Sequence, residues 1–111
     1  MFDGSRNPWQ IALIAVAWAP LYETLLAQAA PLEMTRWLRA PMLMGIALSA
    51  LLFGAAHWIG GGIGHGVVTL FIGAVFAAMY AAFRREGPAV AYGVAAGTHA
   101  VHNSLALLLV H

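Results

Sequence analysis

The feature that most constrains this chain is a run of 44 residues, 40–83, that contains no Asp, Glu, Lys or Arg. Two further runs, 7–22 and 87–111, also lack these residues. A helix that crosses a membrane needs about 20 mainly apolar residues, so the longest run can hold two crossings. Only 8% of the chain is charged, whereas about a quarter of a soluble domain is. We therefore predict an all-α integral membrane protein with a single domain, residues 1–111.

The remaining composition excludes several classes of function. The net charge is +1, so the chain lacks the basic surface of a nucleic-acid-binding protein. The absence of cysteine excludes disulfides and thiolate metal sites. A cleaved signal peptide is disfavoured, because the apolar run from Ile11 to Leu26 is long for one and Pro20 follows the small-residue pattern Ala-Trp-Ala. Membrane lipid is the expected surrounding.

Proline and glycine divide the chain into four predicted transmembrane helices. Helix one begins near Pro8, which suits a first helical turn, and is kinked near Pro31. Helix two runs from Pro41 to Trp58 or Ile59, and the segment "GGGIGHG", residues 60–66, predicts a turn or re-entrant loop. Helix three covers 67–83, the charged turn "RREGP" covers 84–88, and helix four covers 88–110.

Basic residues predict the orientation of this four-helix bundle. Arg36 and Arg39 follow helix one, whereas Arg84 and Arg85 follow helix three. The opposite side carries only Arg6. Because short cytoplasmic loops are enriched in basic residues, we expect these two pairs of arginines in the cytoplasm and both termini outside.

Several polar side chains interrupt the apolar runs. An ionisable group at membrane depth costs about 2.5–3.5 kcal/mol on insertion scales and is a functional candidate for that reason. Residues four apart share one face of a helix, so each such pair forms a polar stripe. The ionisable groups are Glu23, His57, His99 and His102, and the pairs are Thr24 with Gln28, Phe53 with His57, and His99 with Asn103.

Depth decides whether these stripes can meet. If helix one continues past its proline to about Arg39, Glu23 lies 16 residues before the turn and His57 lies 16 residues after Pro41. At about 1.5 Å per residue the two reach the same depth. His99 lies 11 residues after the start of helix four, an offset that a tilted helix can absorb. We therefore predict the long, kinked first helix.

Three motifs, "ETLLAQ" (23–28), "FGAAH" (53–57) and "HAVHN" (99–103), resemble the signatures of the CAAX prenyl endopeptidase and bacteriocin-processing family, also called CPBP or ABI proteins. That family has Glu-Glu-x-x-x-Arg, then Phe-x-x-x-His, then His-x-x-x-Asn or Asp. The first glutamate corresponds to Glu23. Thr24 and Gln28 stand where the family has its second glutamate and its arginine.

The resemblance implies an intramembrane endopeptidase of a prokaryotic cytoplasmic membrane, acting on a membrane-associated peptide or protein. Glu23 would be the general base that activates a water, and His57 would share that water or orient the carboxylate. His99 and Asn103 would donate hydrogen bonds to the oxyanion. The supporting residues would be Thr24, Gln28, Phe53 and His102. No cofactor is favoured, and zinc held by Glu23, His57 and His99 is the alternative.

Other interpretations stay open. The two replacements in the first motif and the short chain favour a non-catalytic immunity or scaffold protein of the same fold. A third alternative is a bundle that handles haem or protons through histidine pairs. A second copy of the chain could complete an open pocket. For His65, inside the glycine segment, a structural or solvated role is favoured over a functional one.

Overall fold

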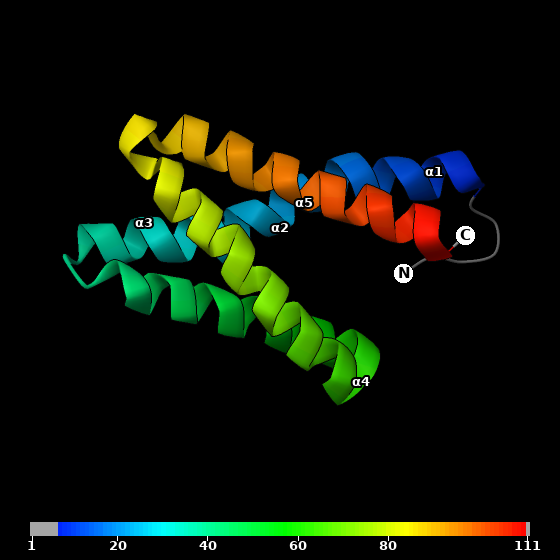
Figure 1. The fold of residues 1–111 in the computed structure, drawn as a ribbon, viewed down its shortest axis with the longest axis horizontal. Helices are drawn as coiled ribbons and strands as arrows, with labels where there is room; N and C mark the ends of the chain where they lie inside the picture. Colours follow the sequence, from blue (N-terminus) through cyan, green and yellow to red (C-terminus); the bar gives the residue numbers. More distant parts are fainter. Residues whose placement is uncertain (1–6, 111) are drawn as a thin grey trace.

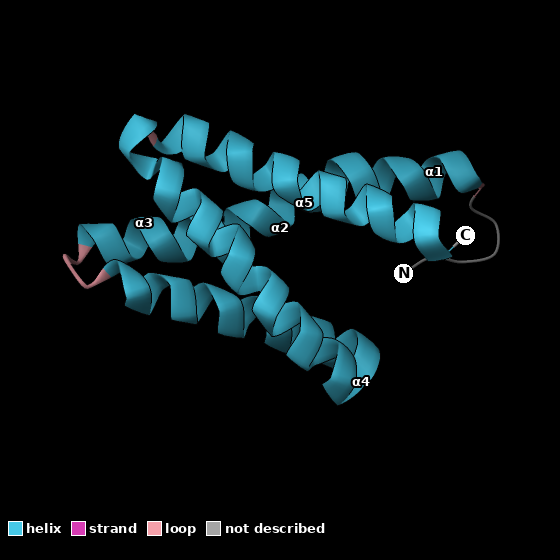
Figure 2. Ribbon diagram, viewed as in Figure 1, coloured by secondary structure: helices cyan, strands magenta, loops and turns pink. Residues whose placement is uncertain are grey.

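The computed structural model describes residues 7–110, and each regular element in that range is helical (Figure 2). Helix α1 (Pro8–Leu13) begins with a capping box. The side chain of Asn7 accepts a hydrogen bond from the backbone N–H of Gln10 at 2.9 Å, and the Gln10 side chain accepts from the N–H of Asn7 at 3.0 Å. This exchange supplies partners for two N–H groups that a helix start leaves free.

The first helix continues without a break from Pro8 to Trp37, as the depth argument predicted. It consists of α1, the π-helical turn η1 (Ile14–Trp18), α2 (Ala19–Thr24), a second π-helical turn η2 (Leu25–Ala29) and α3 (Ala30–Trp37). It ends two residues earlier than predicted, because Arg39 adopts a positive φ of 58° ahead of Pro41.

The two π-helical turns explain how this helix accommodates its prolines. Each turn lies directly before a proline, Pro20 or Pro31, that is the second residue of the next α-helix. Proline has no N–H to donate, and its ring crowds the carbonyl one turn earlier, so the helix widens there. The sequence predicted the irregularity near Pro31 but not the one before Pro20.

Neighbouring helices supply donors to carbonyls in these irregular turns. The hydroxyl of Ser49 donates to the carbonyl of Ala27, which lies four residues before Pro31. In a regular α-helix that carbonyl would accept from the residue that is proline here. The Ser49 side chain therefore replaces a hydrogen bond that the proline removes.

Helix α4 (Met42–Phe83) folds back on itself at one residue. Gly62 has φ 86° and ψ 177°, and Figure 1 shows the two green arms that diverge from this point. The predicted turn is therefore present, but it is confined to Gly62 rather than spread over residues 60–66. Helical dihedral angles on both sides keep the backbone N–H and C=O groups paired, which an apolar environment demands.

The two arms of α4 touch through glycines. A Cβ on Gly54 would lie 2.9 Å from the Cβ of Leu70 and 3.0 Å from the carbonyl oxygen of Gly66. A Cβ on Gly66 would lie 2.6 Å from the Cβ of Trp58. Small residues of this kind let membrane helices approach closely.

Helix α5 (Pro88–Val110) follows the 3₁₀ turn η3 (Arg84–Glu86) and runs back along the first helix (Figure 1). A core of small and aromatic side chains forms where α3, the second arm of α4 and the start of α5 meet, and it consists of Ala29, Leu32, Ala77, Tyr80, Ala91 and Ala95. The turn after α3 and the turn between α4 and α5 lie at the same end of the molecule.

A polar cluster fastens that end. The hydroxyl of Tyr80 donates to Glu33 Oε2 at 2.7 Å, while Arg84 Nε and Nη2 donate to the two carboxylate oxygens at 2.6 and 3.0 Å. A guanidinium that contacts both oxygens of a carboxylate gives a directional, charge-assisted pair. The cluster therefore fixes α3 against the end of α4.

Much of the outer surface is apolar. Ile59, Leu109 and Leu43 are 90%, 85% and 75% exposed, which is unusual in a water-soluble protein. Two of the described helices, Pro8–Trp37 and Met42–Glu86, are long and apolar enough to cross a membrane.

Candidate active site

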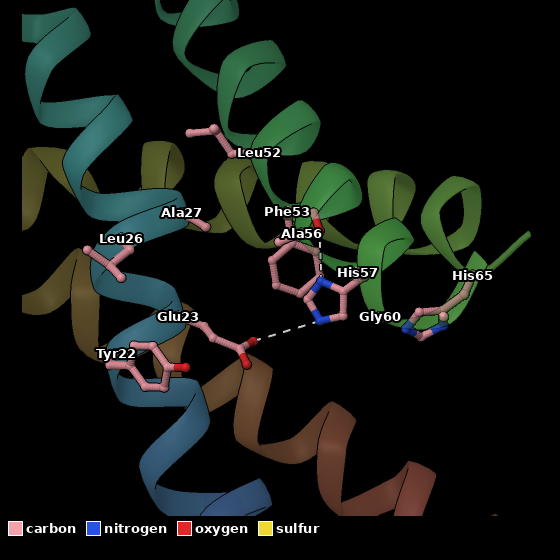
Figure 3. A pocket seen from close by; sticks show the side chains of 11 residues that line it. Tyr22, Glu23, Leu26, Ala27, Leu52, Phe53, Ala56, His57, Gly60 and His65 are labelled. Carbon is pink, nitrogen blue, oxygen red and sulfur yellow. Dashed lines mark hydrogen bonds and ion pairs between the residues drawn. The ribbon is translucent and has the colours of Figure 1, made fainter. Parts of the chain in front are cut away.

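A cavity of about 510 Å³ lies between the first helix and the first arm of α4 (Figure 3). Its volume falls within the range of small-molecule and cofactor sites, roughly 300–1,000 Å³. Apolar side chains, among them Leu26 and Leu52, line one end, and Gly60, Gly61 and His65 line the other. Glu23 and His57 lie between these ends.

The carboxylate of Glu23 points from α2 toward two imidazoles. Its Oε2 atom is 3.9 Å from Nε2 of His57 on α4 and 3.4 Å from Nε2 of His99 on α5. The matched spacing in the sequence predicted that Glu23 and His57 reach the same depth, and in the structure their side chains approach each other. The Glu23 side chain is 28% exposed, so water can reach it.

A contact with the backbone determines which ring nitrogen of His57 carries the hydrogen. Its Nδ1 atom is 2.7 Å from the carbonyl oxygen of Phe53, which can only accept, so Nδ1 carries the hydrogen. In the neutral ring Nε2 then has a free lone pair, and this atom faces Glu23. Two acceptors 3.9 Å apart cannot bond to each other directly, but a water molecule can donate to both.

His99 is held more tightly than His57. It is 1% exposed, and its Nδ1 lies 3.4 Å from the hydroxyl oxygen of Thr24. Its ring stacks on Phe76 with centroids 4.6 Å apart and meets Phe53 edge to face at 5.4 Å. These contacts aim Nε2 of His99 at the carboxylate of Glu23.

Five predicted site residues do not line the cavity: the buried His99 and Thr24, and also Asn103, His102 and Gln28. Asn103 donates from Nδ2 to the carbonyl of Ala15 at 2.8 Å, in the π-helical turn before Pro20. His102 packs edge to face on Phe76, with centroids 5.9 Å apart. Gln28 is fully buried, and within residues 7–110 neither of its amide atoms has a hydrogen-bond partner.

Comparison with protein families matches residues 5–105 to the Rce1-like model, described as type II CAAX prenyl endopeptidase Rce1-like. The chain belongs to the Rce1-like family. This confirms the resemblance that the three motifs carry, and it places the chain at family level among membrane-embedded CAAX-type proteases. The curated proteins and the solved structures gave no match in the same comparisons.

The Rce1-like site can be compared with the zinc alternative. Among the residues that the structure describes, no group of three or more His, Asp or Glu side chains is arranged to hold a metal ion.

One cavity residue was missed by the sequence argument. His65 lines the same cavity as Glu23, and its ring centroid is 5.5 Å from that of His57. The sequence shows only that His65 follows His57 by eight positions across the glycine segment predicted as a turn, so the helix period does not relate the two rings. The reversal at Gly62 brings the two rings together, and the sequence cannot locate that reversal among five glycines.

Proposed function

We propose that the chain is an intramembrane endopeptidase that hydrolyses a peptide bond of a membrane-associated peptide or protein, with Glu23 as the general base. The observation that carries the proposal is the approach of one carboxylate oxygen of Glu23 to two imidazoles, at 3.4 and 3.9 Å, beside the cavity that Glu23 and His57 line. Membership of the Rce1-like family supplies the class of reaction.

The placement in the membrane follows from the uncharged runs and the apolar exterior. We propose four crossings, by the first helix, by each arm of α4 and by α5. Because the two arginine-containing turns lie at one end, the positive-inside rule places that end in the cytoplasm. The turn at Gly62 then lies toward the opposite face, and lipid surrounds the exposed apolar side chains.

In the proposed mechanism one water donates one hydrogen to Glu23 and the other to Nε2 of His57. Its oxygen lone pair then faces the carbonyl carbon of a peptide in the cavity. As the water attacks, its proton passes to the Glu23 carboxylate, and the carbonyl π electrons move to oxygen. A water-poor site strengthens each of these electrostatic interactions.

His99 is the oxyanion donor in this proposal. A hydroxyl hydrogen from Thr24 to Nδ1 leaves the ring hydrogen on Nε2, which faces the reacting centre. The resemblance to the family implied Asn103 as a second donor. Its amide is engaged with Ala15, so we assign Asn103 to holding α5 against the first helix.

Substitution of Glu23 by glutamine tests the proposal. The change keeps the shape but removes the base, so turnover of a membrane-presented peptide should fall at least 10²–10⁴-fold. The measurement is cleavage of a peptide panel by protein reconstituted in liposomes, with melting curves for each variant. Glu86→Gln is the matched control, because Glu86 lies on the exposed turn η3, and it should cleave like the wild type.

Two outcomes would refute the proposed function: wild-type protein that cleaves nothing in the panel, or Glu23→Gln that cleaves normally.

The second candidate, a non-catalytic scaffold or immunity protein, is favoured by one observation. Thr24 and Gln28 replace the charged pair of the family motif, and the Gln28 amide is buried without a partner among the described residues. A haem-binding bundle would show a Soret band in the purified protein.

A further inference from the structure

The glycine turn directs one histidine back into the cavity. His65 follows the reversal at Gly62 and lies at the end of the cavity opposite the apolar side chains, beyond His57 as seen from Glu23 (Figure 3). Its ring packs over Gly61, where an added Cβ would come within 2.5 Å of Cδ2 and 2.7 Å of Cγ. Glycine at 61 therefore makes the space that the His65 ring occupies.

The proposed hydrolysis leaves one task unassigned. When the carbon–nitrogen bond breaks, its electron pair goes to nitrogen, and an amine leaves readily only if that nitrogen gains a proton. His57 cannot supply it, because its Nδ1–H is bonded to Phe53 and its Nε2 faces the water. His99 is buried with its Nε2 directed at the carboxylate of Glu23, and the proposed mechanism already uses it as the oxyanion donor.

We propose that His65 is a further catalytic residue, the general acid that protonates the leaving amine. This inference rests on the proposed function. The ring of His65 lies 5.5 Å from that of His57, centroid to centroid, and both line the cavity. Because reacting atoms approach to roughly 3–3.5 Å, a peptide whose carbonyl carbon lies beside the water on His57 can present its amide nitrogen to His65. His65 is exposed, so it can exchange protons with water.

The protons balance in this scheme. Water gives its oxygen to the acyl carbon and a proton to Glu23, and the imidazolium of His65 gives a proton to the amine nitrogen as the carbon–nitrogen bond breaks. The products are one carboxylic acid and one amine. Glu23 then loses its proton to solvent water, and His65 regains one from the same source, which restores both groups.

A pair of substrates with the same acyl part separates this role from others. One is a peptide amide and the other is an aryl ester, whose leaving group needs no proton. His65→Gln should lower amide hydrolysis by about 10²–10⁴-fold and leave ester hydrolysis within a few-fold of wild type. Gly61→Ala should act in the same direction, because the new methyl group displaces the ring. Gly64→Ala is the matched control, since its Cβ would meet no atom within 4 Å, and it should leave both rates unchanged.

The outcomes are distinct. Equal loss on the two substrates would show that His65 binds substrate or holds the fold, and unchanged amide hydrolysis would show that Glu23 itself returns the proton to the amine. Either result overturns the role of His65. The proposed function still stands in that case if the wild type hydrolyses the amide and the Glu23→Gln variant does not. If wild type hydrolyses neither substrate, the proposed function fails as well.

Discussion

Replacement of Gly73 by alanine tests the packing that supports the site. Gly73 lies on the second arm of α4, and a Cβ there would lie 2.7 Å from the Cβ of Phe53 and 3.0 Å from its ring atoms Cγ and Cδ1. Phe53 is 4% exposed and has little room to move. Its carbonyl fixes His57, and its ring contacts both His57 and His99.

The expected magnitude combines two opposing effects. Alanine is favoured over glycine in a helix interior by about 1 kcal/mol. Overpacking of a tightly filled core costs typically 1–3 kcal/mol. Because the clash reaches the backbone-proximal Cβ of Phe53 rather than a flexible chain end, we expect the upper part of that range and a net loss of up to about 2 kcal/mol. Turnover should fall too, because a shift of Phe53 also moves His57, which contacts its carbonyl and its ring.

The control is Gly93→Ala on α5, where an added Cβ meets no atom within 4 Å. That variant should be as stable as the wild type or more stable by up to about 1 kcal/mol. The measurement is reversible unfolding in mixed micelles, followed by circular dichroism as the denaturing detergent is increased. A Gly73→Ala protein that matches Gly93→Ala in stability would refute the close contact between the arms of α4.

Three further predictions use the same unfolding measurement. Tyr80→Phe should cost about 1.5 kcal/mol, the lower value for a hydrogen bond to a charged group, and the cost should shrink in a Glu33→Gln background. Asn103→Ala should destabilise by about 1–3 kcal/mol because it leaves the Ala15 carbonyl unpaired, whereas an oxyanion donor would lower kcat without loss of stability. Ser49→Ala should destabilise similarly, and Pro31→Ala should recover much of that loss, because residue 31 then donates to Ala27 itself.

The sequence could predict that Glu23 and His57 lie at matching heights in their helices, because such heights depend on counting residues. An α-helix rises by a fixed amount per residue, so equal distances of Glu23 and His57 from one turn bring them together wherever the helices stay continuous. The need for matching heights is also the reason for the prediction that the first helix continues beyond Pro31. Glu23 and His57 lie 3.9 Å apart in the structure, so the π-helical turn before this proline changes the height of Glu23 too little to separate them.

The partners of Asn103 and His65 could not be predicted in this way. A proline and the π-helical turn before it change which carbonyls lack a backbone donor, and counting helix positions does not decide whether Asn103 pairs with Ala15 or with Val16. The direction of His65 depends on the dihedral angles of a single residue, Gly62. Neither the helix count nor the period of the apolar residues contains that information.

The change at position 24 has a chemical consequence that links the divergent motif to the mechanism. An ionised glutamate beside Nδ1 of His99 can only accept, which would place the ring hydrogen on Nδ1 and leave Nε2 without one. Thr24 has a hydroxyl hydrogen to give to Nδ1, so the ring hydrogen can lie on Nε2, the atom directed at Glu23. In the proposed mechanism the neutral residue therefore lets His99 act as the donor to the oxyanion, and no buried arginine is then needed to balance a second carboxylate.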